Sequence, residues 1–157
     1  MKVALWMVGK TSFPYLQDGF NIYEKRLKHY LSYQSLVIPD VKNAKHLKPT
    51  QIKQKEGDLI EKYLEKGDFL ILLDENGKSY TSIQFSKFFE KQLEMSHKRI
   101  IFLIGGAYGF SDAIYKRANS KLSLSDMTFS HQMVRLFAIE QIYRALTIMK
   151  GEPYHHV

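Results

Sequence analysis

Three uninterrupted apolar stretches place the strongest limit on how this chain can fold. Two of them, Phe69 to Leu73 and Ile100 to Ile104, lie in the middle of the chain, and a third runs from Val3 to Val8. A strand that is apolar at every position must be buried on both faces, as in a parallel sheet covered by helices. We therefore expect these stretches to be strands of a mostly parallel sheet.

Segments with helical periodicity alternate with the predicted strands. A first helix is expected from Tyr15 to Leu31, because apolar residues recur there at spacings of three and four. A second should begin at Thr50 as its N-cap, and a third at Thr81, which can form a capping box with Gln84. A final helix is expected from His131 to Met149.

Two shorter strands, Ser35–Ile38 and Leu122–Leu124, complete the predicted elements. Strands that alternate with helices are typical of an α/β fold, in which helices cover both faces of a mostly parallel sheet. The length and the absence of a repeat or linker predict one domain over residues 1–157.

The last helix is apolar almost all the way round. Only Glu140, Arg144 and Thr147 form a narrow polar stripe on it. A helix of this kind must be buried on more than one side, so we predict that a second copy of the chain covers part of it in a homodimer. The alternative is a central helix that the chain covers by itself.

Charge and composition narrow the choice of partner. The chain carries a net charge of +7, which favours an anionic partner, nucleic acid first. It has no cysteine, which excludes disulfides and thiolate metal sites and suits a cytoplasmic protein. No apolar run is long enough to cross a membrane, and the N-terminal apolar stretch is better explained as a first strand than as a signal peptide.

A glycine-rich segment follows the strand that ends at Ile104. Gly105, Gly106 and Gly109 allow positive φ angles and a close approach of a ligand to the backbone. Ligands of open α/β sheets bind at the carboxyl ends of the strands, so this turn is a candidate binding site. A tight turn without a ligand is the alternative, because the spacing matches neither a Rossmann fingerprint nor a P-loop.

A serine-rich segment, residues 122–131, joins the last strand to the last helix. Its hydroxyls, free backbone groups and apolar Met127-Thr128-Phe129 step suit a flat ring with polar anchors. The alternative is an ordinary loop in which Ser130 caps the helix, because such a loop would contain the same types of residue. Arg135 lies among apolar neighbours in the helix that follows, and we expect it to reach a carboxylate of a partner or a phosphate.

The C-terminal tail offers the remaining groups that can do chemistry. Tyr154 can stack on a base, and His155 can exchange a proton near neutral pH. Glu140 and Arg144, four residues apart on the helix before the tail, form either a solvated ion pair or part of the same site. His131, His155 and His156 lack the spacing of a metal site, so no metal is predicted.

Together these motifs resemble a known family. The stretches IGGAYGF, LSLSDMTFSHQMVR and IEQIYRALTIMKGEPYHH, with VALWMVGK and YEKRL near the N-terminus, closely resemble the ribosomal RNA large subunit methyltransferase H family of the SPOUT class. The resemblance covers the whole chain and is most specific in its C-terminal half. It implies a SPOUT fold with a C-terminal trefoil knot, an obligate homodimer, and S-adenosylmethionine as the cofactor.

The resemblance also implies a substrate and a set of cofactor contacts. The family methylates N3 of a pseudouridine in helix 69 of 23S ribosomal RNA, and it acts on assembled ribosomes. Carried over by motif, the cofactor contacts come from one strand end, one glycine and the serine-rich segment. They are Leu73, Gly105, Leu124, Ser125, Asp126, Met127, Thr128 and Phe129.

Two positions depart from the family pattern. Ser130 replaces the usual proline, which should have little effect, and His156 replaces an arginine or lysine in the tail. Because arginine is always charged while histidine is mostly neutral at pH 7, the second change is expected to weaken a phosphate contact.

Methylation of a ring nitrogen requires that its proton leave. We expect His155 to accept that proton, Tyr154 to stack on or hydrogen-bond the base, and Arg144, oriented by Glu140, to offset negative charge together with Arg135. The tail of one subunit would complete the site of the other. Two alternatives stay open: a non-catalytic RNA- or ribosome-binding module, and a SPOUT enzyme that acts on transfer RNA.

Overall fold

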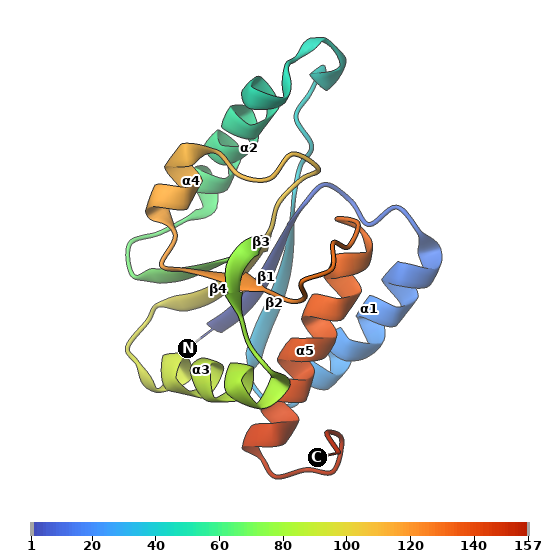
Figure 1. Ribbon diagram of the computed structural model, residues 1–157, viewed down its shortest axis with the longest axis vertical. Coiled ribbons are helices and arrows are strands. Elements are labelled where there is room, and N and C mark those ends of the chain that lie inside the picture. Colours follow the sequence, from blue (N-terminus) through green and yellow to red (C-terminus); the bar gives the residue numbers. More distant parts are fainter. Residues whose placement is uncertain (1, 157) are drawn as a thin grey trace.

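The computed structural model describes residues 2–156, and its centre is one five-stranded sheet (Figure 1). The strands lie in the order β2-β1-β4-β3-β5, and every neighbouring pair is parallel. The predicted parallel sheet is therefore confirmed. The strands are β1 (Lys2–Val8), β2 (Ser32–Ile38), β3 (Asp68–Ser79), β4 (Arg99–Ile104) and β5 (Ser120–Ser123).

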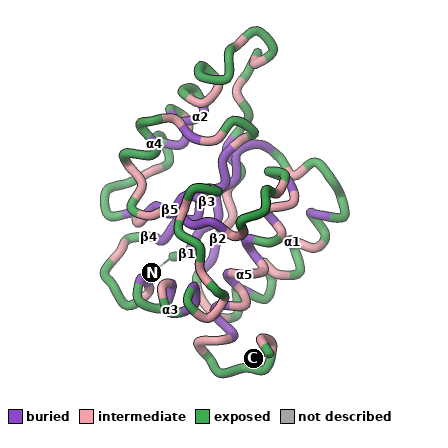
Figure 2. Tube along the Cα trace, in the orientation of Figure 1, coloured by how far each residue is buried: buried purple, intermediate pink, exposed green. Residues whose placement is uncertain are grey.

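Helices cover both faces of this sheet, as the sequence predicts. Alternate residues of β1 and β4 belong to two separate apolar cores, one on each face, and both cores are buried (Figure 2). α1, α3 and α5 pack on one core, whereas α2 and α4 pack on the other. The helices are α1 (Pro14–Leu27), α2 (Pro49–Tyr63), α3 (Ser82–Glu94), α4 (Asp112–Arg117) and α5 (Met133–Met149), with a 3₁₀ turn η1 (Ala44–His46).

Capping residues set where two of the helices begin. Thr81 Oγ1 accepts the N–H of Gln84 at 3.1 Å, and Gln84 Oε1 accepts the N–H of Thr81 at 2.9 Å, so the predicted capping box is confirmed. The prediction of Thr50 as an N-cap is wrong, because α2 begins one residue earlier at Pro49, with Lys48 as its N-cap. Proline has a fixed φ and no N–H, which suits the first position of a helix.

β3 continues well beyond Leu73, where its apolar run stops. It pairs with β5 again at Lys78 and Ser79 after a shift in register, so Asn76-Gly77 lies within the strand. A Cβ at Gly77 would lie 2.7 Å from the backbone nitrogen of Leu122, so a side chain there would collide with β5. This extension places the side chains after Leu73 at the edge of the sheet.

α5 packs against α1 and α3 on the sheet, so the chain itself covers much of its apolar surface (Figure 1). Phe137 nevertheless keeps 41% of its surface exposed. Thr147, the third residue of the polar stripe, is fully buried, and its hydroxyl donates to the carbonyl of Arg144. Glu140 and Arg144 remain half-buried.

Candidate functional site

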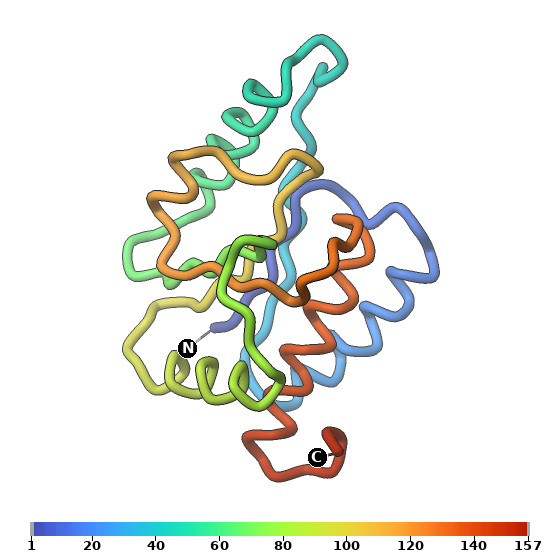
Figure 3. The backbone as a smooth tube through the Cα atoms, viewed as in Figure 1, coloured from blue at the N-terminus to red at the C-terminus, as the bar shows by residue number. Residues whose placement is uncertain are grey.

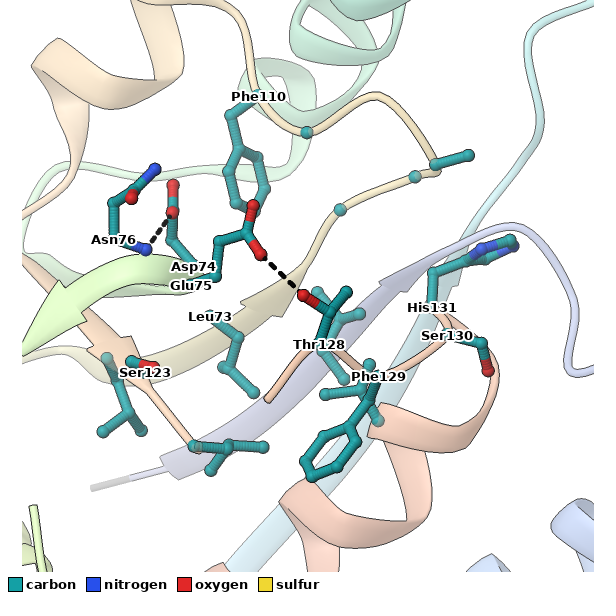
Figure 4. Close-up of a pocket in the computed structure, with 18 of the residues that line it drawn as sticks. Leu73, Asp74, Glu75, Asn76, Phe110, Ser123, Thr128, Phe129, Ser130 and His131 are labelled. Carbon is teal, nitrogen blue, oxygen red and sulfur yellow. Dashed lines mark hydrogen bonds between the residues drawn. The ribbon is translucent and has the colours of Figure 1, made fainter. Parts of the chain in front are cut away.

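The two predicted binding segments meet in one pocket at the carboxyl edge of the sheet (Figure 4). The pocket has a volume of about 510 Å³ and is lined by the glycine turn after β4, the serine-rich loop after β5, and the part of β3 around Leu73. Of the residues predicted to contact a cofactor, all but the exposed Asp126 line it. Those seven are Leu73, Gly105, Leu124, Ser125, Met127, Thr128 and Phe129.

The glycine turn has a backbone shape that side chains would prevent. Gly109 has a φ of +83°, and its N–H donates to the carbonyl of Gly106 at 3.2 Å. A Cβ at Gly105 would lie 2.9 Å from the ring of Phe110, which itself lines the pocket. The turn thus keeps backbone groups at the pocket wall and leaves space beside them.

Serine hydroxyls hold the loop on the opposite wall. Ser123 Oγ donates to the carbonyl of Ser125 at 3.0 Å, and Ser125 Oγ accepts the N–H of Met127 at 3.0 Å. Ser130 Oγ accepts the N–H of Met133 at 3.0 Å, which ties the loop to the first turn of α5. Such local bonds fix a loop that has no regular secondary structure.

An acidic wall that we did not predict from the sequence completes the pocket. Asp74, Glu75 and Asn76 line the pocket from the extended part of β3. Glu75 accepts a hydrogen bond from the hydroxyl of Thr128 at 3.1 Å (Figure 4). The carboxylate of Asp74 accepts one from Tyr115, whose pKa is raised to about 12 by burial and by this bond. The signal was present, since two acidic residues follow a buried strand at its carboxyl end.

The lining combines apolar surface, backbone groups and carboxylates. Leu73, Leu124 and Phe129 supply an apolar surface for a flat ring, while Asp74 and Glu75 supply negative charge. This donor set fits a ligand that carries both a planar aromatic group and a positive charge.

Behind the glycine turn lies a buried carboxylate of α2. Glu56 is 9% exposed, and its Oε2 would lie 2.6 Å from a Cβ placed on Gly106. Burial, and next the charge of Asp40, raise the pKa of Glu56 to about 7. The packing of Glu56 against Gly106 fixes α2 to the pocket wall.

A second cluster, which we call the tail cluster, joins the predicted residues of the tail to those of α5. Its members are Glu140, Arg144, Tyr154 and His155. Glu140 lies at its centre. Its Oε1 accepts hydrogen bonds from Arg144 at 2.5 Å and from the hydroxyl of Tyr154 at 2.8 Å. The Arg144 guanidinium also lies 4.8 Å from the centre of the Tyr154 ring and 3.1 Å from Nδ1 of His155. The structure thus brings Glu140, Arg144, Tyr154 and His155 together.

The environment of the cluster keeps two of its groups protonated. The pKa of Tyr154 is raised by burial, by a hydrogen bond with Tyr23 and by a hydrogen bond with Glu140, so its hydroxyl acts as a donor. Burial alone would lower the pKa of Arg144, but the ion pair with Glu140 outweighs it and raises that pKa. The cluster therefore contains a charged guanidinium, balanced by the carboxylate of Glu140, and a neutral tyrosine hydroxyl.

Within one chain, the tail cluster and the pocket lie apart. The pocket is lined by α5 residues only up to Val134, whereas Arg144 is ten residues further along the helix. At 1.5 Å per residue, that spacing corresponds to about 15 Å. No residue of the tail cluster lines the pocket.

Arg135 does not face outward, so the expectation that it reaches a phosphate or a partner carboxylate is corrected. It is 1% exposed and donates to the carbonyls of Val8 and Gly9 at 2.8 Å each. It also donates to His131 O and Thr11 Oγ1. Arg135 thereby fastens α5 to the end of β1, and its burial keeps it from facing a substrate.

Comparison with known proteins decides the family. A family model described as "Predicted SPOUT methyltransferase" matches residues 1–155. Relatives from Parabacteroides distasonis and Cytophaga hutchinsonii, both named ribosomal RNA large subunit methyltransferase H, are each 55% identical over 156 residues. The matches cover 99% of this chain and 99% and 100% of those proteins. The chain belongs to the methyltransferase H family of SPOUT methyltransferases.

A solved structure supports the fold of this methyltransferase H family member. A probable methylase family protein from Haemophilus influenzae matches with a TM-score of 0.51 at 9% identity. The match covers 96% of this chain, which spans 66% of the length of that protein.

Two further findings concern membranes and metals. Among residues 2–156, no helix has the length and apolar character needed to cross a membrane. Within the same residues, no three histidine, cysteine, aspartate or glutamate side chains are grouped as a metal ion would require.

Proposed function

We propose that this chain methylates N3 of a pseudouridine in helix 69 of 23S ribosomal RNA, on the assembled ribosome and in the cytoplasm. The observation that supports it most directly is the meeting of the glycine turn with the serine-rich loop in one pocket, in a member of this family. The names of the relatives point to large-subunit ribosomal RNA. One domain, residues 1–157, would carry the whole activity.

S-adenosylmethionine is the cofactor that the pocket fits. When bound, it supplies a methyl group on a positively charged sulfur. Leu73, Leu124 and Phe129 would hold its apolar ring, the glycine turn would offer backbone groups, and Asp74 with Glu75 would favour its positive charge. Asp126 is exposed in the same loop and would contact the cofactor only from the pocket rim.

The tail cluster would act on the nucleotide. The ring nitrogen of the pyrimidine loses a proton on methylation, so negative charge on the ring must be stabilised. Arg144, oriented by its ion pair with Glu140, would supply that stabilisation. Tyr154 packs its ring against Tyr143 and Arg144 and would support the cluster while contacting the base.

His155 could act as a hydrogen-bond donor or as a proton acceptor, and its contact with Arg144 distinguishes these two roles. A guanidinium has donors only, so Nδ1 of His155 accepts and Nε2 carries the proton of the neutral ring. In this arrangement His155 donates a hydrogen bond to the substrate. The predicted role of His155 as proton acceptor requires that the contact with Arg144 break first.

A homodimer would bring the tail cluster of one subunit to the pocket of the other. The separation of the two clusters along α5 supports this composite site. Large apolar side chains exposed on α1 and α5 offer a surface for the second subunit, among them Tyr15, Ile22 and Phe137. The trefoil knot that the family resemblance implies is part of the same proposal, and it would involve the two loops that form the pocket.

Labelled cofactor and intact ribosomes test the proposal. Equilibrium binding should show uptake of S-adenosylmethionine, and methyl transfer should modify assembled ribosomes but not transfer RNA. Uptake without transfer would favour a non-catalytic RNA- or ribosome-binding module. Transfer to transfer RNA alone would favour the other SPOUT activity, and absence of uptake would refute the enzyme assignment.

A further inference from the structure

The positive charge of this chain is concentrated between β2 and the middle of α2. Residues 41–55 contain five lysines and no acidic residue, in a chain whose net charge is +7. These lysines are Lys42, Lys45, Lys48, Lys53 and Lys55. No step of the proposed methyl transfer uses any of them.

The charge of this segment is open to solvent. Four of the lysines are exposed, and Lys53 is half-buried. Among the ion pairs of residues 2–156, none involves a lysine of this segment. Cations that form no ion pair are available to phosphate, since no intramolecular pair must first be broken.

The segment has an ordered backbone. The N–H of Leu47 donates to the carbonyl of Ala44 in the 3₁₀ turn, and Gln51 Oε1 accepts the N–H of Lys48 at the start of α2. The left-handed conformation of Asn43, with a φ of 58°, turns the chain into this unit. The N-terminus of α2 adds the partial positive charge of a helix dipole beside these lysines.

The segment leaves the sheet at the edge where the pocket lies. All five strands are parallel, so the chain emerges from β2 at Ile38 on the same side as the glycine turn and the serine-rich loop. In Figure 1 the segment forms the projecting tip next to α2, beyond the turn that leads into α4. The contact between Glu56 and Gly106 fixes α2, and with it this tip, to the pocket wall.

We propose that residues 41–55 form an RNA-binding arm, which grips backbone phosphates of the RNA beside the target nucleotide. This inference rests on the proposed function, because it assigns a second contact to the same substrate. RNA is favoured over other polyanions because the arm and the pocket share one edge, so one strand can pass both. Lysines bind phosphate as point charges without reading sequence, which suits an arm that only holds the strand.

The test compares two triple variants that remove equal charge. The arm variant is Lys45→Gln, Lys48→Gln and Lys55→Gln, and the control is Lys66→Gln, Lys87→Gln and Lys91→Gln. All six lysines are exposed, but those of the control lie on α3 and in the loop before β3, away from the pocket edge. The dissociation constant for intact ribosomes is measured for wild type and both variants over a range of KCl concentrations.

The arm variant should bind intact ribosomes roughly 10- to 100-fold more weakly at low salt, with a slope of log K against log salt smaller by about 2. The control variant should stay within about threefold of wild type. Affinity for S-adenosylmethionine and the melting temperature should not change in either variant. Equal weakening in both variants, or an unchanged salt slope in the arm variant, overturns the proposal.

This result can be separated from that of the proposed function, because ribosome binding is measured without methyl transfer. A wild-type chain that binds through the arm yet transfers no methyl group would refute the enzyme assignment and keep the arm. If wild type methylates ribosomes and the arm variant binds ribosomes as tightly as wild type does, the enzyme assignment stands and the arm is refuted.

Discussion

Arg144 Nη1 lies 3.1 Å from Nδ1 of His155, so an arginine that can only donate sets the proton arrangement of the histidine ring. Glu140 holds the arginine in place from its other side at 2.5 Å. The Nε2–H of His155 is then the free polar group at the end of this chain of contacts. Whether His155 donates or accepts a proton during methyl transfer thus depends on one contact between the tail and α5.

Two substitutions of His155 separate these roles. His155→Gln keeps an N–H donor near the Nε2 position, whereas His155→Ala removes it. If His155 donates, His155→Ala should lower the single-turnover rate by about 10- to 100-fold and His155→Gln should recover most of that loss. If His155 accepts the proton, both variants should be equally slow and should lose the same step in the pH profile. Cofactor affinity is the control and should not change.

Arg135 gives a prediction of a different kind, because its contacts are all with the chain itself. Arg135→Met would leave the carbonyls of Val8 and Gly9 without their donor, which should cost about 3 kcal/mol in the free energy of unfolding. Urea denaturation measures this loss. The rate per folded molecule should stay near that of wild type. An Arg135→Met variant with full stability but no activity would instead support a contact of Arg135 with a phosphate or with a carboxylate of the partner subunit.

Glu56 predicts an unusual pH dependence of stability. Its pKa is raised from 4.5 to about 7, so the folded state keeps a proton that the unfolded chain releases at lower pH. This group therefore makes the protein less stable as the pH rises from about 4.5 to about 7, and the loss is complete above that range. Glu56→Gln removes this loss.

At pH 8 the Glu56→Gln variant should exceed wild type by about 1–3 kcal/mol in the free energy of unfolding, and at pH 4 the two should agree. Urea denaturation at both pH values checks this. The exposed neighbour Asp58 provides the control, since Asp58→Asn should show no such difference. A Glu56→Gln variant that is less stable than wild type at pH 8 would mean that the charged carboxylate is stabilising.

The exposed apolar face of α1 predicts how the homodimer can be disrupted. Tyr15 and Ile22 lie two turns apart on one face of this helix and are 63% and 52% exposed. Replacing both by Glu should shift sedimentation equilibrium from dimer to monomer, because charge would be buried at the interface. Met95→Glu, at an exposed site after α3, is the control. A wild-type monomer, or a variant that remains dimeric, would contradict this interface.

The parallel sheet and the pocket could be predicted because their signals are local. Ile100 to Ile104 is apolar at each position and is followed at once by glycines, so both the buried strand and the turn can be read from neighbouring residues. The helix α4 was not predicted, because its six residues are too few for helical periodicity to show.

Other features depend on residues far away in the chain. Asn76-Gly77 favours a turn by itself, and only pairing with β5 keeps it within a strand. The burial of Arg135 depends on carbonyls of Val8 and Gly9, more than 120 residues earlier. The periodicity of α5 gives no information about these distant acceptors. The acidic wall of Asp74 and Glu75 likewise depends on distant residues, because the loops that face it come from later parts of the chain.

Mixing two inactive variants tests the composite site most directly. One variant, Gly105→Val, blocks the pocket, and the other, Tyr154→Ala with His155→Ala, disables the tail cluster. After subunit exchange, half of the dimers are mixed, and each mixed dimer regains one intact site if tail and pocket come from different subunits. A composite site predicts recovery of about one quarter of the wild-type methylation rate. No recovery, although mass spectrometry shows mixed dimers, would contradict it.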